Sequence, residues 1–94
     1  MKIQWLEDAT HDLYELRQYI AEDNLFAANR VAERILSALE VLSEQPGIGR
    51  QGRIIGTREL IVSGTPYIIP YRVKNNVIEI LRVLHSALQW PEEL

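Results

Sequence analysis

The sequence contains no cysteine among its 94 residues. This absence excludes disulfide bonds, thiolate metal sites and thiol nucleophiles, and it favours a cytosolic protein. Histidine is also scarce: the two histidines lie far apart in the sequence, which argues against a structural metal site. We therefore expect a protein without a bound metal or cofactor.

Long apolar runs are absent too, and none approaches the length of a membrane span. The first residues, Met-Lys-Ile-Gln-Trp-Leu-Glu-Asp, lack the apolar core of an export signal. We expect a cytoplasmic protein that does not contact a membrane. With only four prolines and five glycines and 47% hydrophobic residues, the composition is that of a globular protein, and we expect residues 1–94 to form one domain.

Basic residues are outnumbered 10 to 13, so the net charge at pH 7 is −3. Residues 1–45 hold four basic and nine acidic side chains, whereas residues 46–85 hold six basic and two acidic ones. The acidic total argues against strong non-specific nucleic-acid binding, and we expect no sequence-specific DNA binding by this chain alone. The basic second half can still attract a polyanion or an acidic peptide.

The first half predicts a short strand at residues 3–6 followed by two amphipathic helices. Asp8 or Thr10 is the expected N-cap of the first helix, which ends near Glu22, and Asn24 is the expected N-cap of the second. The very short connection predicts an antiparallel helical hairpin. The apolar stripes that predict the two helices consist of Ala9, Leu13, Leu16 and Ile20, and of Ala28, Val31, Ile35, Ala38 and Leu42.

The second half begins with a loop at residues 45–53, where one proline and three glycines oppose a helix. Tight turns at 63–66 and 74–76 then separate three predicted strands, at residues 58–62, 67–73 and 77–85. Pro70 has no N–H to donate, so the middle strand is either bulged there or unpaired on that side.

The element order β-α-α-β-β-β predicts the α+β class. We expect an antiparallel, twisted sheet with the helical hairpin packed on one face. The opposite face is then left for solvent, a ligand or a partner.

His85 ends the last predicted strand. Its imidazole is suited to act as a general acid or base in RNA cleavage, or it is a structural histidine hydrogen-bonded at a strand end. Arg58 and Arg72 lie near the ends of neighbouring strands. Each binds a phosphate or carboxylate through its planar guanidinium. The structural alternative is that Arg58 pairs with the neighbours of Glu59 or with Glu79 across the sheet.

Other arginines and aromatic residues are candidates for binding. Arg50 and Arg53 contact an external macromolecule, or they keep an exposed loop soluble. Arg82 alternates with Leu81 and Val83 and so faces away from His85, toward a partner or solvent. The remaining candidates are Trp90, which follows the last strand and packs down, and Tyr67 and Tyr71, which share a strand face and either stack on a base or pack in the core.

Five motifs follow one another in a recognisable order: Pro-x-x-Gly-Arg at 46–50, Gly-Thr-Arg-Glu-Leu at 56–60, Tyr-x-x-x-Tyr-Arg-Val at 67–73, Ile-Leu-Arg-Val-Leu-His at 80–85 and Trp-Pro at 90–91. Together they resemble the RelE/ParE superfamily, the toxins of bacterial type II toxin–antitoxin modules. The resemblance covers the whole chain. It implies a cognate antitoxin whose C-terminal segment wraps the toxin.

The superfamily has two branches: ParE-like toxins poison DNA gyrase, and RelE-like toxins cut mRNA on the ribosome. The acidic net charge, the loop without lysine and the absence of a tyrosine after His85 favour the ParE-like branch. The resemblance therefore implies a plasmid-stabilisation toxin that inhibits gyrase without catalysis. The alternatives are an mRNA endonuclease that uses His85 with Arg58 or Arg72, and a non-toxic module that only binds the antitoxin.

Each hypothesis implies its own set of site residues. The target-binding residues in the gyrase hypothesis are Arg50, Arg53, Arg58, Arg82 and Trp90. The antitoxin is expected to lie along the helical hairpin and the sheet edge, which offer exposed backbone for strand addition and an apolar groove. Its expected contacts are Leu13, Leu16, Tyr67 and Tyr71.

Overall fold

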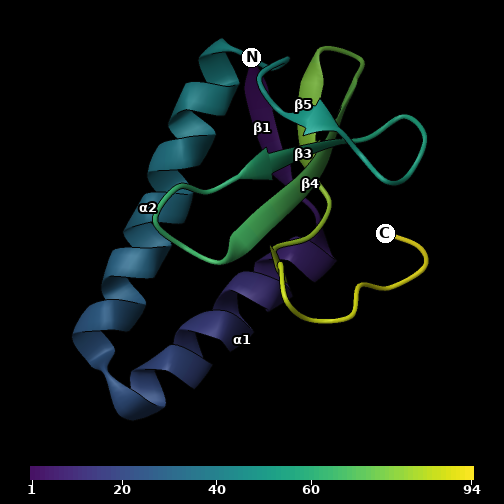
Figure 1. Ribbon diagram of the computed structural model, residues 1–94. Helices are drawn as coiled ribbons and strands as arrows, with labels where there is room; N and C mark the ends of the chain where they lie inside the picture. Colours follow the sequence, from purple (N-terminus) through teal and green to yellow (C-terminus); the bar gives the residue numbers. More distant parts are fainter.

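Two layers form the molecule, a six-stranded sheet and a pair of helices that meet in a V at their short connection (Figure 1). The computed structural model describes residues 1–94. Its elements in chain order are β1 (Lys2–Trp5), α1 (Glu7–Asp23), α2 (Leu25–Glu44), β2 (Arg50–Gln51), β3 (Arg58–Ile61), β4 (Tyr67–Lys74), β5 (Val77–Ile80) and β6 (Leu84–His85). The predicted α+β architecture is confirmed.

The strand order is β1-β5-β4-β3-β2, and β6 also pairs with β4. Every pair is antiparallel except β1 with β5, which is parallel from Lys2 opposite Val77 to Trp5 opposite Ile80. The expected antiparallel sheet therefore needs one correction. Parallel neighbours require a long connection, and more than seventy residues separate β1 from β5.

The start of α1 differs from the prediction, because Leu6 is its N-cap and no side chain caps it. The backbone N–H of Leu6 still donates to Ile80 O in β5, at 3.0 Å, so the helix begins directly at the end of the strand. The cap predicted for α2 is confirmed: Asn24 Oδ1 accepts from the backbone N–H of Ala27 at 3.0 Å. Neither helix is long and apolar enough to cross a membrane.

The core lies between the helices and the sheet. The predicted apolar stripes supply its helical side, and alternate residues of the central strands supply the other side. Seven of its members are less than 1% exposed: Ala9, Ile35, Leu42, Ile69, Tyr71, Ile78 and Ile80. The faces predicted for both helices are thus confirmed.

The last predicted strand is in fact two short strands with a bulge between them. Tyr71 faces Ile80 on one side of the break, and Tyr67 faces His85 on the other, so β4 has one residue fewer than its partner. The carbonyl of Pro70 accepts from Leu81 N at 3.0 Å, which places the missing N–H of Pro70 on the same side. The ladder is interrupted where the proline has no donor, as predicted.

The second face of the sheet is less open than predicted. Glu59, Ile68, Pro70 and Leu81 are buried although they are not part of the core between the helices and the sheet. The loop that carries β2 and the tail after β6 lie on this side of the molecule, at the right of Figure 1. Part of the face predicted for a ligand is therefore covered by the chain itself.

Candidate functional site

Glu59 organises the arginine-bearing loop. Its side chain is 2% exposed, and its Oε1 accepts from Nε and Nη2 of Arg50 at 3.1 and 3.0 Å. Its Oε2 accepts from the backbone N–H of Arg53 at 2.8 Å, with Arg53 Nε 3.7 Å away. One buried carboxylate thus holds two arginines and the loop backbone.

We assigned no role to Glu59 from the sequence. It is the only acidic residue between 46 and 78, and it follows three of the chain's arginines within ten positions. That isolation among cations is the signal that could have identified it.

The tail after β6 is joined to this loop through Trp90. The guanidinium of Arg53 lies over the indole ring, 3.6 Å from its centroid, which is cation–π geometry. The indole Nε1–H donates to His85 O at 3.3 Å. The predicted packing of Trp90 is confirmed, and it places the tail against the loop.

One hypothesis was that Arg58 pairs with Glu79 across the sheet, and the structure shows that it does not. Its Nη1 donates to Gly49 O at 2.9 Å, at the start of the loop. The hydroxyl of Tyr71 accepts from Gly49 N at 2.9 Å and donates to Pro46 O at 2.7 Å, and burial raises the pKa of this tyrosine. A Cβ at Gly49 would lie 2.6 Å from the Tyr71 ring, so the close approach requires glycine.

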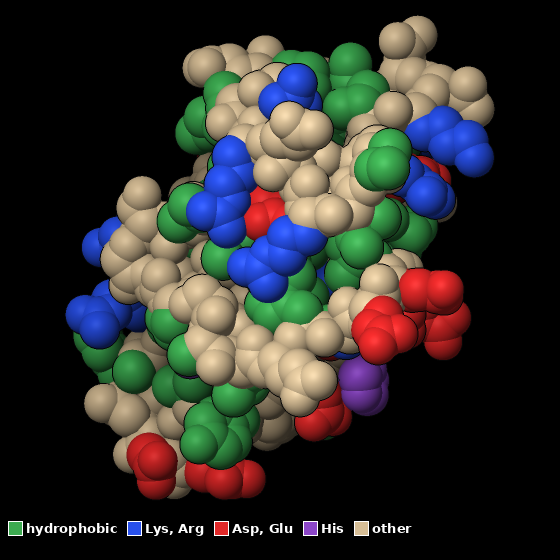
Figure 2. Space-filling view, turned by 45° about the vertical axis from the view of Figure 1, so that its right-hand side comes forward, with side chains coloured by type: hydrophobic (Ala, Val, Ile, Leu, Met, Phe, Trp, Pro, Cys, Tyr) green, Lys and Arg blue, Asp and Glu red, His purple; other side chains and the backbone are tan.

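The loop arginines remain accessible although they are anchored. The side chains of Arg50 and Arg53 are 50% and 51% exposed. With the side of the loop turned forward, Figure 2 shows Lys and Arg side chains across the upper part and the middle of one face and most acidic side chains toward its lower end. The result is a fixed basic surface on an acidic protein.

His85 is half-buried, and its ring meets the Tyr67 ring edge-on at 5.5 Å. The backbone N–H of Ala87 donates to its Nδ1 at 3.1 Å. A neutral imidazole with an acceptor at Nδ1 carries its proton on Nε2. In this arrangement neither nitrogen has a free lone pair, so His85 is not placed to take a proton as a general base.

The structure does not bring His85, Arg58 and Arg72 together. His85 faces Tyr67 and Arg58 faces Tyr71, four residues further along β4, which is roughly 13 Å at about 3.3 Å per residue. Arg72 projects from the opposite face of β4, because side chains alternate along a strand. There its Nε donates to Glu79 Oε1 at 2.5 Å, so Glu79 pairs with Arg72 and not, as the sequence had suggested, with Arg58.

Arg82 is occupied by an acid far away in the sequence. Its Nε and Nη2 donate to the two carboxylate oxygens of Asp12 in α1, at 2.7 and 2.9 Å. Donation of these hydrogen bonds to the Asp12 carboxylate raises the pKa of Arg82, and Asp12 also accepts from Val83 N at 3.0 Å. This ion pair ties the bulge to α1, where we had expected Arg82 to face a partner or solvent.

The residues expected at the antitoxin surface lie mostly inside the molecule. Leu16 and Tyr67 are each 8% exposed and Tyr71 is fully buried, so all three belong to the core. Leu13 is partly buried against the same core. For the tyrosines, the structure matches the core alternative.

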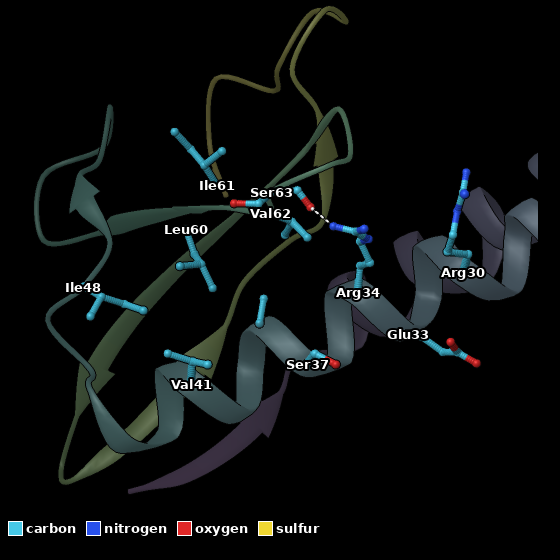
Figure 3. Close-up of a pocket in the computed structure, with 11 residues that line it drawn as sticks. Arg30, Glu33, Arg34, Ser37, Val41, Ile48, Leu60, Ile61, Val62 and Ser63 are labelled. Carbon is cyan, nitrogen blue, oxygen red and sulfur yellow. Dashed lines mark hydrogen bonds between the residues drawn. The ribbon is translucent and has the colours of Figure 1, made fainter.

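An apolar groove runs between α2 and the edge strand β3 (Figure 3). It encloses about 560 Å³, and its apolar wall includes Val41, Ile48 and Ile61, which are 42–54% exposed. Arg30 and Arg34 lie toward its other end, and Arg34 Nη1 donates to Ser63 O at 3.2 Å. In the sequence, this groove could have been identified from the apolar residues of α2 and the following loop that lie outside the core stripes.

The edge of β3 adds hydrogen-bonding groups to this groove. β2 pairs only with Arg58 and Glu59, which leaves the outer edge of β3 without a partner from Leu60 onward. Val62 N donates to Tyr67 O in β4, so the N–H and C=O of Ile61 point to the opposite, open side. No cluster of three or more His, Asp or Glu side chains is placed to hold a metal ion.

Comparison with known proteins places the chain among toxins. Residues 3–90 match the family described as the ParE toxin of the type II toxin–antitoxin system parDE. The putative toxin Y4kP of Sinorhizobium fredii is 47% identical over 93 residues, covering 99% of this chain and 96% of that protein. Toxin RelE2 of Caulobacter vibrioides is 36% identical over 86 residues, covering 92% and 96%.

Solved structures agree with this placement. A chain of the chromosomal ParDE toxin–antitoxin system of P. aeruginosa has a TM-score of 0.80 at 27% identity, covering 90% of this chain and 95% of that one. A chain of the RelBE2 toxin–antitoxin complex of Mycobacterium tuberculosis has a TM-score of 0.67 at 26% identity, covering 89% and 95%. The chain therefore belongs to the ParE toxin family, within the RelE/ParE superfamily of type II toxin–antitoxin toxins.

Proposed function

We propose that this toxin inhibits DNA gyrase by binding it, without catalysing a reaction, and that it serves plasmid stabilisation. The observation that carries the proposal is the state of His85. Its Nδ1 accepts the backbone N–H of Ala87, and the arginines that would stabilise a cleaved phosphate lie elsewhere on the sheet. Without an assembled nuclease site, the simplest mode of action is that the toxin inhibits its target by binding to it.

The proposed gyrase-binding surface is the arginine loop with Trp90. Arg50 and Arg53 present half of their surface, and Glu59 keeps both guanidinium groups from moving freely. Anchoring lowers the side-chain entropy that binding would otherwise cost. Arg58 and Arg82 hold internal partners, so we assign them supporting positions beside this surface.

We further propose that a cognate antitoxin occupies the groove between α2 and β3. The open backbone of Ile61 can accept one added strand, and the apolar wall can hold alternate side chains of that strand. Arg30 and Arg34 favour an acidic residue at one end of the bound segment. The proposal replaces Leu16, Tyr67 and Tyr71, whose side chains are buried in the core.

The alternative function is ribosome-dependent mRNA cleavage. Relatives named RelE2 and RelE3 favour it, as does the partly exposed position of His85 beside a cavity. This mechanism requires His85 to release the N–H of Ala87 and to recruit an arginine from another part of the sheet. It thus predicts a rearrangement of the tail before catalysis.

Induction of the toxin in a susceptible bacterium tests both proposals. Gyrase inhibition predicts filamentation and an SOS response while protein synthesis continues. The double substitution Arg50→Glu with Arg53→Glu should abolish toxicity, whereas His85→Ala should retain it. Rapid translation arrest with cleaved mRNA, lost in His85→Ala, would instead establish the nuclease. No growth effect from a folded chain that still binds an antitoxin would leave the non-toxic binding module.

Co-expression with the antitoxin encoded beside the toxin gene tests the groove. Ile61→Arg should weaken the complex, because it places a charge against the added strand. Ile55→Arg is the matched control, since Ile55 is 99% exposed and does not line the groove. Equal binding by both variants would exclude this groove as the antitoxin site.

A further inference from the structure

A second cavity of about 560 Å³ lies between α1, β6 and the tail. It shares only Trp90 with the proposed gyrase-binding surface, and the antitoxin proposal does not use it. Its walls are rich in rings: Tyr19, Tyr67, His85 and Trp90 all line it. Tyr19 is 73% exposed at the entrance, and Tyr67 and His85 form an edge-on pair on the strands. A cavity of this size is ordinary for a specific ligand site.

The only charged side chains that line the cavity are acidic ones, Asp12 and Glu15. Asp12 is neutralised by Arg82, which donates to both of its oxygens. Glu15 is 66% exposed, and its sole ion-pair neighbour is His11 at 3.7 Å, itself 71% exposed. The cavity therefore combines aromatic walls with the exposed carboxylate of Glu15. No Lys or Arg lines it, and Arg53 covers one face of the Trp90 ring from the loop side.

We infer that this cavity binds an arginine side chain presented by a partner protein. The negative faces of aromatic rings attract a guanidinium, and a carboxylate can pair with it through two parallel hydrogen bonds. Arginine stacks on rings more readily than lysine because its cation is planar and more weakly hydrated. A nucleic acid fits less well, because its phosphates would meet Glu15 with no cation in the wall.

Direct titration tests this inference on the intact toxin. The probe is N-acetyl-arginine methylamide, compared with the citrulline analogue, which has nearly the same shape without the charge. The Trp90 indole N–H signal in a two-dimensional NMR spectrum reports binding, and the Trp5 indole on β1 is the internal reference. We expect a saturable shift of the Trp90 signal with the arginine probe alone.

The second part of the test reverses the charge of a residue that lines the cavity. Glu15→Lys should weaken arginine binding by about tenfold, since an exposed ion pair is replaced by a repulsive one. Glu22→Lys makes the same change on α1 outside the cavity and should bind as the wild type does. Equal shifts with citrulline, unchanged binding by Glu15→Lys, or a stronger Trp90 shift with a single-stranded oligouridylate would each overturn the inference. These outcomes do not depend on whether the toxin acts on gyrase or on the ribosome.

Discussion

The two faces of the sheet are stabilised in different ways. The face toward the helices is held by apolar packing, with thirteen buried residues in one cluster. The face toward the loop and tail depends on one buried carboxylate, Glu59, and on the arginines that surround it. Apolar packing spreads its stabilising free energy over many weak contacts, whereas the ionic arrangement depends on a few directional hydrogen bonds. The loop should therefore respond to single substitutions that leave the core intact.

Ile35→Ala should produce the largest loss of stability. Ile35 is fully buried in α2, and removing its outer carbons leaves a cavity that costs about 3 kcal/mol. Urea unfolding measures this as a lower midpoint. The same variant should keep the loop resistant to trypsin under native conditions, since the contacts of Glu59 are unchanged. Early cleavage at Arg50 or Arg53 would show that the two faces are coupled.

Glu59→Gln should have a smaller effect on stability and a larger one on the loop. It removes the charge that both arginines contact, at a cost of about 2 kcal/mol for hydrogen bonds to an ionised group. Trypsin should then cut the loop in the folded protein, whereas the core resists. Glu79→Gln is the control, because that carboxylate pairs with Arg72 outside the loop. A protected loop in Glu59→Gln would contradict the anchoring role.

Tyr71→Phe should cost about 1 kcal/mol, because it leaves Gly49 N and Pro46 O without their hydroxyl partner while the ring still packs in the core. Thermal unfolding measures the loss. NMR signals of residues 46–50 should broaden or shift, whereas those of β5 should not. A stability equal to the wild type would mean that water replaces the hydroxyl.

Burial raises the pKa values of Tyr67 and Tyr71, so stability should fall in alkaline solution. Above about pH 10 the unfolded chain releases tyrosine protons that the folded chain retains, and unfolding becomes more favourable as pH rises. The stabilisation is complete below pH 10 and is lost as the pH passes the raised values. Urea midpoints measured from pH 8 to 11 should decline, and less steeply in Tyr71→Phe. A flat profile would exclude the burial effect.

Glu79→Gln should have the smallest effect, below about 0.5 kcal/mol, because its partner Arg72 is 43% exposed. Urea unfolding of this variant and of Glu59→Gln gives a direct comparison of an exposed and a buried carboxylate. A loss of stability as large as that of Glu59→Gln would show that the different exposure of the two carboxylates does not determine how much each contributes.

Local patterns in the sequence were sufficient to predict much of the fold. The helix stripes follow from side-chain spacing, the cap from Asn24, and the reversal between β4 and β5 from two asparagines that adopt positive φ, 51° at Asn75 and 61° at Asn76. Pro70 predicted the interrupted ladder because a missing N–H has the same consequence in any sheet.

The candidate site was harder to predict, because its contacts join residues far apart in the chain. His85 was identified as a candidate, but its tautomer depends on the N–H of Ala87, and Arg82 was left with solvent or a partner although Asp12 binds it from 70 positions away. The burial of Tyr71 likewise depends on where the loop after α2 comes to lie.

The sequence by itself determined the two helices, the turns and the family, because each depends on neighbouring residues or on motifs in order. The short strand β2, in the predicted loop, and the division of the last strand into β5 and β6 were not predicted. Only the tertiary structure decided the parallel pairing of β1, the burial of Glu59 and the separation of His85 from Arg58 and Arg72. Strand register and loop placement set these features. Both depend on contacts between distant segments of the chain. The free energies of such contacts cannot be read from a local pattern of residues.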